Sequence, residues 1–370
     1  MTILIACDKY KHSLSAIKVC KSIAKGLSEK DSTLKLEIHP MADGGDGTLA
    51  VLREHLELEI HECECIDPLG KPIHARYATF GITAYIELAE ASGIALLKKQ
   101  DLNPMITTTI GTGILIKDAI RKGFENIVLS IGGSCTTDAG LGIAQALGFK
   151  FLNSKGQELT PAGGNLNQIQ TIVKPLEDIT SRFTILCDVE NTLYGPNGAA
   201  YVFSPQKGAT KDQVKFLDQG LQQIAKLIYS FNGKQISKLQ GGGAAGGISA
   251  GLYGLLDAEI KSGFSFLSHL SKLEEKIKSA DLVITGEGQL DSQSFSGKVV
   301  GQIEVLCQKH EKPLIAIVGN TSLTAEEKKQ SALQKVYSVL PLAKNLEDAM
   351  SNTEVYLFQI AVKIDLDQSL

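Results

Sequence analysis

Short apolar runs alternate with segments of helical periodicity towards both ends of the chain. The runs predict buried strands, which occupy Ile3–Ala6, Leu34–His39, Leu282–Thr285, Leu314–Val318 and Val336–Leu340. Apolar residues at helical spacing follow them, and we expect helices around 17–27, 49–56, 299–310 and 325–333 and a terminal helix. Strands that alternate with helices are typical of a doubly wound parallel sheet. We therefore predict one α/β domain with a five-stranded sheet built from both ends of the chain.

The pattern changes in the middle of the chain. Leu58–Ile66 alternates between polar and apolar residues, and Ile73–Phe80 and Thr83–Glu87 follow it after short turns, which favours antiparallel pairing. Later segments again predict strands at Ile127–Ile131 and Phe183–Cys187 and helices near 112–122 and 212–229. We therefore expect an inserted α/β domain with a mixed sheet over residues 63–279, and a discontinuous domain over 1–62 and 280–370.

Composition and charge narrow the class of protein. The 370 residues are 43% apolar and 21% charged, as in a soluble globular protein, and the net charge of −4 gives no electrostatic case for nucleic acid binding. No apolar run approaches the roughly 18 residues of a membrane span, and the start of the chain does not read as a secretory signal. Seven cysteines form neither a zinc pattern nor a disulfide framework. We expect a cytoplasmic protein without a membrane partner.

A loop of small residues after the Ile127–Ile131 run is the first candidate for chemistry. Two glycines allow a ligand to approach the backbone closely, and three hydroxyl side chains and one carboxylate follow. These residues are Gly132, Gly133, Ser134, Thr136, Thr137 and Asp138. Because a helical pattern comes next, the loop is typical of a phosphate or oxyanion site. The alternative is a tight turn between a strand and a helix.

Acidic residues collect where predicted strands end, at the edge of a parallel sheet that binds ligands. They are Asp8, Asp43, Asp46, Asp188, Glu287 and Asp291. Carboxylates separated by glycines suit Mg²⁺, although a solvated loop or a helix cap would explain each acid alone. Positive charge for a phosphate or a substrate carboxylate could come from Lys9 and Lys11, which lie near Ser13, or from Lys207 and Lys298.

Two familiar nucleotide motifs are incomplete. Gly241–Gly246 has the spacing of a dinucleotide fingerprint, but no clear βαβ unit surrounds it. Gly297-Lys298 resembles the end of a P-loop, but Val299 stands where Ser or Thr is required. The alternative that the protein is a nicotinamide-dependent dehydrogenase therefore rests on one glycine segment alone.

Seven blocks occur in order along most of the chain. They are Asp8-Lys-Tyr-Lys-His-Ser-Leu-Ser-Ala16, Met41-Ala-Asp-Gly-Gly-Asp-Gly-Thr48, Gly132–Gly140, Cys187–Asn191, Phe203–Ala209, Gly241–Gly247 and Thr285–Ser292. Together they resemble the bacterial type I glycerate kinases, of the glycerate 2-kinase type. The resemblance implies a discontinuous flavodoxin-like domain with an inserted domain. It also implies phosphorylation of D-glycerate from ATP with Mg²⁺, with the 2-position favoured.

Residues that match the family pattern carry over from this resemblance: Lys11, Ser13, Asp43, Asp46, Asp138, Asp188, Glu287, Asp291 and Lys298. The chain also departs from the pattern. The family usually has Pro, Ser, Phe and Gly where this chain has Cys7, Lys9, Tyr10 and His12, respectively. It also usually has Asn where this chain has Thr137 and Arg where this chain has Gln289.

We combine these residues into one hypothesis for phosphoryl transfer. Gly132–Thr137 and a lysine would hold the ATP phosphates, and the other substrate or nucleotide ligands would be Lys9, Ser13, Gly44, Gly45 and Lys298. Mg²⁺ would be placed by some of Asp43, Asp46, Glu287 and Asp291. Asp188 or Asp138 would accept the hydroxyl proton of glycerate, and Lys11 would hold its carboxylate.

The expected site lies in a cleft between the two domains, and the protein could form an oligomer. A sensor that binds glycerate or phosphate without turnover is the alternative from another functional class.

Overall fold

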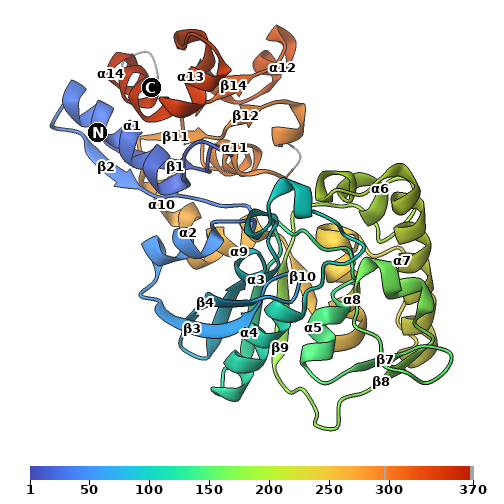
Figure 1. The fold of residues 1–370 in the computed structure, drawn as a ribbon. Coiled ribbons are helices and arrows are strands. Elements are labelled where there is room, and N and C mark those ends of the chain that lie inside the picture. Colours follow the sequence, from blue (N-terminus) through green and yellow to red (C-terminus); the bar gives the residue numbers. More distant parts are fainter. Residues whose placement is uncertain (296, 367–370) are drawn as a thin grey trace. The chain divides into compact units, whose positions relative to one another are not determined.

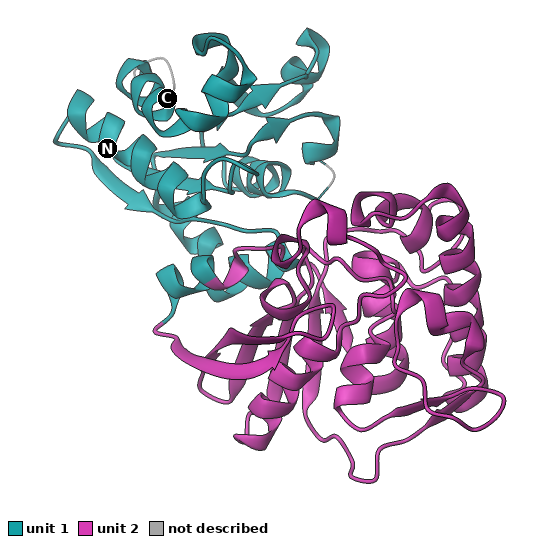
Figure 2. Ribbon diagram, viewed as in Figure 1, with its two compact units in different colours: residues 1–43, 50–56, 263–370 teal, residues 44–49, 57–262 magenta. Residues whose placement is uncertain are grey.

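The computed structural model describes residues 1–295 and 297–366 and divides into two compact units (Figures 1 and 2). The first unit comprises Met1–Asp43, Ala50–Leu56 and the described part of Gly263–Leu370, and the second comprises Gly44–Leu49 and Glu57–Ser262. Both units are therefore discontinuous in sequence. The boundary expected at residues 62 and 63 falls inside β3 (Glu59–Ile66), all of which lies in the second unit.

The first unit is built on a five-stranded sheet in which every neighbouring pair is parallel, as predicted. Its order is β15-β13-β11-β1-β2. The strands are β1 (Thr2–Cys7), β2 (Lys35–Ile38), β11 (Leu282–Gly286), β13 (Leu314–Val318) and β15 (Leu333–Ser338). A small parallel pair, β12 (Gln289–Leu290) and β14 (Asn320–Thr321), accompanies it.

The last strand of this sheet lies earlier than predicted. We expected a helix to Leu333 and a strand over Val336–Leu340, whereas α12 (Ala325–Gln330) ends sooner and β15 begins at Leu333. Leu333 pairs with Leu314 in the neighbouring strand, so the sheet ladder determines its conformation. This tertiary pairing overrides the helical spacing of the local sequence.

Helices surround the sheet of the first unit. They are α1 (Ala16–Lys30), α9 (Gly263–Leu270), α10 (Leu273–Ser279), α11 (Val299–Lys309), α12, α13 (Leu346–Ser351) and α14 (Thr353–Lys363), and α2 (Thr48–His55) spans a boundary between the units. Helices α1 and α14, from the two ends of the sequence, pack against each other. A Cβ atom at Gly26 of α1 would lie only 2.5 Å from the carbonyl oxygen of Phe358 in α14. Glycine therefore permits close packing of the first and last long helices.

The second unit contains a six-stranded mixed sheet in the order β10-β9-β6-β5-β4-β3. Its strands are β3, β4 (Pro72–Phe80), β5 (Thr83–Glu87), β6 (Asn126–Ser130), β9 (Arg182–Leu186) and β10 (Glu259–Lys261). The chain runs antiparallel from β3 to β5 and parallel from β5 to β10, as the change of sequence pattern predicted. A separate antiparallel pair consists of β7 (Lys150–Leu152) and β8 (Thr171–Val173).

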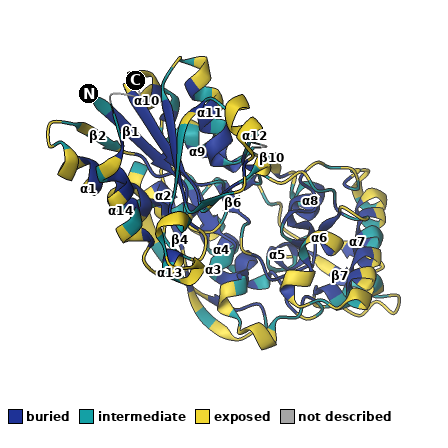
Figure 3. Ribbon diagram, turned by 90° about the horizontal axis from the view of Figure 1, so that it is seen from above, coloured by how far each residue is buried: buried dark blue, intermediate teal, exposed yellow. Residues whose placement is uncertain are grey.

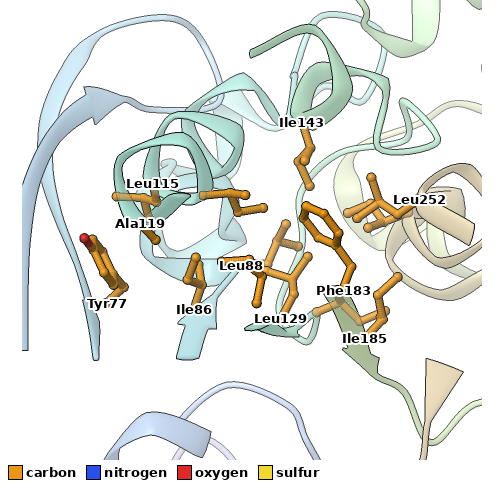
Figure 4. Close-up of a cluster of buried hydrophobic side chains, with 14 of the residues drawn as sticks. Tyr77, Ile86, Leu88, Leu115, Ala119, Leu129, Ile143, Phe183, Ile185 and Leu252 are labelled. Atoms are coloured by element: carbon orange, nitrogen blue, oxygen red, sulfur yellow. The ribbon is translucent and has the colours of Figure 1, made fainter. Parts of the chain in front are cut away.

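Helices of the second unit bury apolar side chains against its sheet and against each other. They are α3 (Ala89–Ser92), α4 (Ile110–Arg121), α5 (Leu141–Ala146), α6 (Ala199–Phe203), α7 (Lys211–Asn232) and α8 (Ala244–Leu256). Figure 4 shows one such cluster, to which Leu115 of α4, Ile143 of α5 and Phe183 of β9 belong. Buried residues follow the central strands in both units, whereas exposed residues mark the outward faces of the helices (Figure 3).

None of the described helices combines the length and the apolar character needed to cross a membrane.

Candidate active site

Two buried carboxylates follow adjacent strands of the first unit. Cys7 of β1 lies opposite Gly286 of β11, and Asp8 and Glu287 are the next residues. Their exposed fractions are only 9% and 7%. Burial, reinforced by the Asp43 carboxylate, raises the pKa of Asp8 to about 8, and burial raises the pKa of Glu287 to about 7. Among the described residues, Glu287 Oε1 has no hydrogen-bond partner.

Lys9 and Asp43 lie beside these acids. The Lys9 N–H donates to Asp8 Oδ1 at 2.7 Å, and Lys9 Nζ lies 4.0 Å from Asp43 Oδ1. The Met41 N–H donates to the Cys7 carbonyl oxygen at 2.9 Å, which aligns the Asp43 loop with the end of β1. Lys9 lowers the pKa of Asp8, but burial and Asp43 raise it by more.

Asp291 and Lys298 belong to the same neighbourhood. Lys298 Nζ lies 3.9 Å from Asp291 Oδ1, which also accepts a hydrogen bond from the Ser294 N–H at 3.1 Å. Burial has the largest effect on the pKa of Glu287, which Lys298 lowers and Asp291 raises. The structure thus brings Asp43, Asp291 and Lys298 together around Glu287, with Asp8 and Lys9 beside them.

A tight turn carries Lys11 and Ser13. The Leu14 N–H donates to the Tyr10 carbonyl oxygen at 2.9 Å, and the Tyr10 hydroxyl donates to the Ile317 carbonyl oxygen at 2.6 Å. Lys11 is exposed at the tip of this turn. Ser13 Oγ donates to the Met350 carbonyl oxygen at 2.8 Å, so its hydroxyl links the turn to the C-terminal helices.

No group of three or more His, Cys, Asp or Glu side chains within residues 1–295 and 297–366 is arranged to hold a metal ion. The acids predicted as Mg²⁺ ligands also fall in both units: Asp43, Glu287 and Asp291 in the first, and Asp46 in the second. Mg²⁺ commonly uses one or two carboxylates and takes its other ligands from water and phosphate. The unpartnered Glu287 oxygen is chemically suited to that arrangement.

The loop of small residues is the main feature of the second unit. Of the N–H groups from Gly132 to Asp138, only that of Cys135 donates a hydrogen bond to another group in the described chain. A Cβ atom at Gly132 would lie 2.4 Å from Gly45 Cα, so glycine at this position allows residues 44–46 to pack against the loop. Gly133 and Gly44 have φ angles of 71° and 81°, in the left-handed region that favours glycine. The loop therefore presents unused backbone donors.

Lys207 lies beneath this loop. Its side chain is 1% exposed, and its Nζ donates to Ser134 Oγ at 2.8 Å and to the Thr136 carbonyl oxygen at 2.5 Å. Burial lowers the pKa of Lys207 to about 8. The neighbouring Thr137 hydroxyl lies 3.0 Å from Ser204 Oγ, so the loop is tied to the segment that carries Lys207 at two points.

Asp138 is fully buried and its carboxylate is saturated with hydrogen bonds. It accepts bonds from the Thr109 N–H and hydroxyl, both at 2.8 Å, and from the N–H groups of Gly140 and Gly142. Burial raises the pKa of Asp138, and these bonds lower it. The carboxylate therefore holds the start of α5 against the Thr109 segment.

Asp188 and Glu87 lie at the same edge of the sheet as the loop. β5, β6 and β9 are parallel neighbours, and Asp188 comes two residues after the end of β9. Asp188 is half-buried. Glu87 ends β5 and accepts a hydrogen bond from the Leu49 N–H at 2.7 Å, and burial raises the pKa of Glu87. The carboxyl ends of these strands therefore bring together Asp188, Glu87 and the loop.

Three prominent residues were left out of the combined hypothesis for the site, although Asp8 and Lys207 had been considered as candidates. Asp8 and Glu87 each lie at the end of a predicted strand, a signal that was present in the sequence. Lys207 was a weaker cationic candidate, because its 71-residue separation from the Thr136 carbonyl hides the contact from local patterns.

The glycine segment Gly241–Gly247 packs against the loop. A Cβ atom at Gly246 would lie 2.2 Å from the Thr136 carbonyl oxygen, and the Ala139 N–H donates to the Gly246 carbonyl oxygen at 3.1 Å. A Cβ atom at Gly243 would similarly lie 2.2 Å from the Thr192 carbonyl oxygen. Close backbone packing accounts for these glycines, and a dinucleotide is not needed to explain them.

Comparisons with known proteins agree along nearly the whole chain. The model of the glycerate kinase family matches residues 3–366. Glycerate 2-kinase of Escherichia coli K12 is 39% identical over 94% of this chain and 93% of its own, and glycerate kinase of Bacillus subtilis 168 is 38% identical over 98% and 96%. A crystal structure from Salmonella typhimurium LT2, assigned as a glycerate kinase 2, is 35% identical, covers 100% of both chains and has a TM-score of 0.82.

Proposed function

Because this chain belongs to the glycerate kinase family, we propose that it phosphorylates D-glycerate with ATP and Mg²⁺ and that 2-phosphoglycerate is the product. We infer glycerate as the phosphate acceptor from the names of the similar proteins. Phosphoryl transfer requires positioning and neutralisation of charge, with little covalent chemistry from the protein.

The observation that carries the proposal is the loop from Gly132 to Asp138. Its N–H groups, apart from that of Cys135, donate to no other group in the described chain, and Lys207 is buried directly beneath it. Backbone donors without an acceptor near a buried cation favour an anionic ligand. We assign the ATP phosphates to this loop.

Asp188 is the general base in this proposal. It follows a strand whose position in the sheet is fixed, and a base must be held where it can take the hydroxyl proton of glycerate. Asp138 is less suited, because its buried carboxylate already accepts four hydrogen bonds. We assign it to holding the loop. The exposed Lys11 would bind the glycerate carboxylate as a point charge.

Glu287 and Asp43 are the carboxylates we assign to Mg²⁺, with Asp46 and Asp291 as further candidates. Glu287 supplies an oxygen without a partner, and oxygen is the ligand that Mg²⁺ prefers. When bound, Mg²⁺ would neutralise charge on the phosphate oxygens. Lys9 and Lys298 would add positive charge at the same group of acids.

A coupled assay tests the proposal. The purified protein should release ADP from ATP only when D-glycerate and Mg²⁺ are both present, and phosphorus NMR of the product should show 2-phosphoglycerate. L-glycerate, lactate and glycolate serve as matched acceptors, which differ from D-glycerate in configuration, in one hydroxyl group and in one hydroxymethyl group, respectively. A 3-phosphoglycerate signal would correct the position of transfer. Tight ligand binding without ADP release would instead support a sensor.

A further inference from the structure

Lys207 is buried without a carboxylate partner. Other lysines of the second unit, such as Lys122 and Lys234, contact Asp118 and Asp257. Lys207 forms no ion pair with any described residue, although its side chain is 1% exposed. Burial of an unpaired ammonium is unfavourable for folding. The position therefore calls for an explanation other than stability.

The two bonds of Lys207 both end on the loop. An ammonium group has three N–H donors, and the described residues supply acceptors for two of them, Ser134 Oγ and the Thr136 carbonyl oxygen. In a trans peptide the C=O and the following N–H point in opposite directions. By holding the Thr136 carbonyl oxygen, Lys207 therefore turns the Thr137 N–H away from itself.

Two further segments hold the loop by close packing and backbone hydrogen bonds. Gly246 packs against the Thr136 carbonyl group so closely that a Cβ atom would not fit, and the Ala139 N–H is bonded to the Gly246 carbonyl oxygen. On the other side, the Cys135 N–H donates to the Ser92 carbonyl oxygen at 3.1 Å. Lys207 is thus the charged member of a set of contacts that fixes the direction of the unused N–H groups.

We propose that Lys207 is a positioning residue, which holds the backbone donors of Gly132–Thr137 in a geometry that binds phosphate and supplies buried positive charge beneath them. This inference rests on the proposed assignment of phosphates to the loop. Lys207 acts through the peptide groups it orients, and its own Nζ need not reach the ligand.

The titration of Lys207 provides an independent readout. Burial lowers its pKa to about 8, and the groups that act on it electrostatically are Cys135 and Asp138. Loss of the proton above this pH would remove the charge and one donor from the contacts. Phosphate binding by the unaltered protein should therefore weaken as the pH rises through about 8.

Lys207→Met, which keeps the length of the side chain and removes its charge, tests the proposal. We expect the Kd for inorganic tripolyphosphate to rise at least about tenfold, as when a charged hydrogen bond is lost. We also expect kcat/KM for ATP to fall about a hundredfold, as for displaced binding groups. Amide hydrogen exchange should accelerate at Cys135 and Ala139, and the pH dependence near 8 should disappear. The melting temperature should change little, because removal of the buried charge offsets the loss of the two hydrogen bonds.

Lys234→Met is the matched control, since Lys234 Nζ also donates to a backbone carbonyl oxygen, that of Tyr253, in the same unit. It should leave tripolyphosphate binding and loop exchange unchanged. Unaltered binding and exchange in Lys207→Met would overturn the proposal. Faster exchange throughout the second unit with a lower melting temperature would also overturn it, because Lys207 would then be a general structural residue. If the unaltered protein releases no ADP with glycerate, the proposed function fails, whereas the exchange comparison still decides the role of Lys207.

Discussion

The acids of the first unit and Lys207 at the loop of the second unit are of opposite charge type, and burial shifts their pKa values in opposite directions. Asp8 and Glu287 are buried carboxylates whose pKa values burial raises, to about 8 and about 7. Lys207 is a buried ammonium whose pKa burial lowers to about 8. In each region burial therefore disfavours the charged form of the side chain. Under the proposed function, a ligand of opposite sign would compensate each region, a cation in the first unit and an anion in the second.

The largest expected effect is at Asp188, which we propose as the general base and which belongs to neither of these charged regions. Asp188→Asn keeps the size of the side chain but removes its ability to take a proton, so kcat should fall at least about a hundredfold. Steady-state kinetics measures this change. ATP affinity and the melting temperature should remain close to those of the unaltered protein.

Asp178→Asn, at an exposed position of the same unit, is the control and should leave kcat unchanged. A near-normal kcat with a lower melting temperature in Asp188→Asn would make Asp188 structural. The base would then have to be sought among the other acids at this sheet edge, including Glu87.

A smaller effect tests whether the first unit binds the cation. Asp43→Asn removes one charged oxygen beside Asp8, so the Mg²⁺ concentration that gives half-maximal activity should rise about 10–100-fold. Titration of activity with Mg²⁺ at saturating ATP measures it. Asp212→Asn, at the exposed start of α7, should leave the requirement unchanged. The same requirement in both variants would assign the Asp43 loop a structural role.

The smallest effect concerns stability and pH. The pKa of Asp8 is about 8 in the fold against an ordinary 3.8, so its contribution to stability is fully present below 3.8 and is lost as the pH rises through 8. Lys207 has the opposite sign: its contribution is present above 10.5 and is lost as the pH falls through about 8. Asp8→Asn should therefore stabilise the protein more at pH 9 than at pH 5.

Melting temperatures of Asp8→Asn and the unaltered protein across this pH range provide the measurement. Glu29→Gln, on the exposed side of α1, should give a difference that does not change with pH. A constant difference for Asp8→Asn as well would show that Asp8 titrates as an ordinary carboxyl group.

The fold was largely predictable because its strands are short apolar runs, whereas its helices are longer and repeat their apolar residues at helical spacing. Such patterns are local, and they correctly placed the parallel sheet of the first unit and the mixed sheet of the second. The placement of acidic residues after strands was also predictable. Asp43, Asp188 and Glu287 follow β2, β9 and β11 along the chain.

The partner of each side chain was less accessible to sequence reasoning. Ser13 and Asp138 match the pattern of ligand loops, yet their side chains bond to Met350 and Thr109, which are distant in sequence. The same limit applies to Lys207, whose importance follows from its burial and from contacts with Ser134 and Thr136. Burial and long-range contacts are properties of the packed chain, and no spacing of residue types encodes them directly.

The path of the chain between the units has a practical consequence for dissecting the protein. Residues 44–49 belong to the second unit although the residues on both sides of them belong to the first. They supply the Gly45 backbone that lies against Gly132 and the Leu49 N–H that binds Glu87. A fragment cut at Glu57 and Ser262 would therefore lose the segment that packs against Gly132 and bonds to Glu87. Expression of a self-sufficient second unit would require residues 44–49 to be grafted back by a linker or a circular permutation.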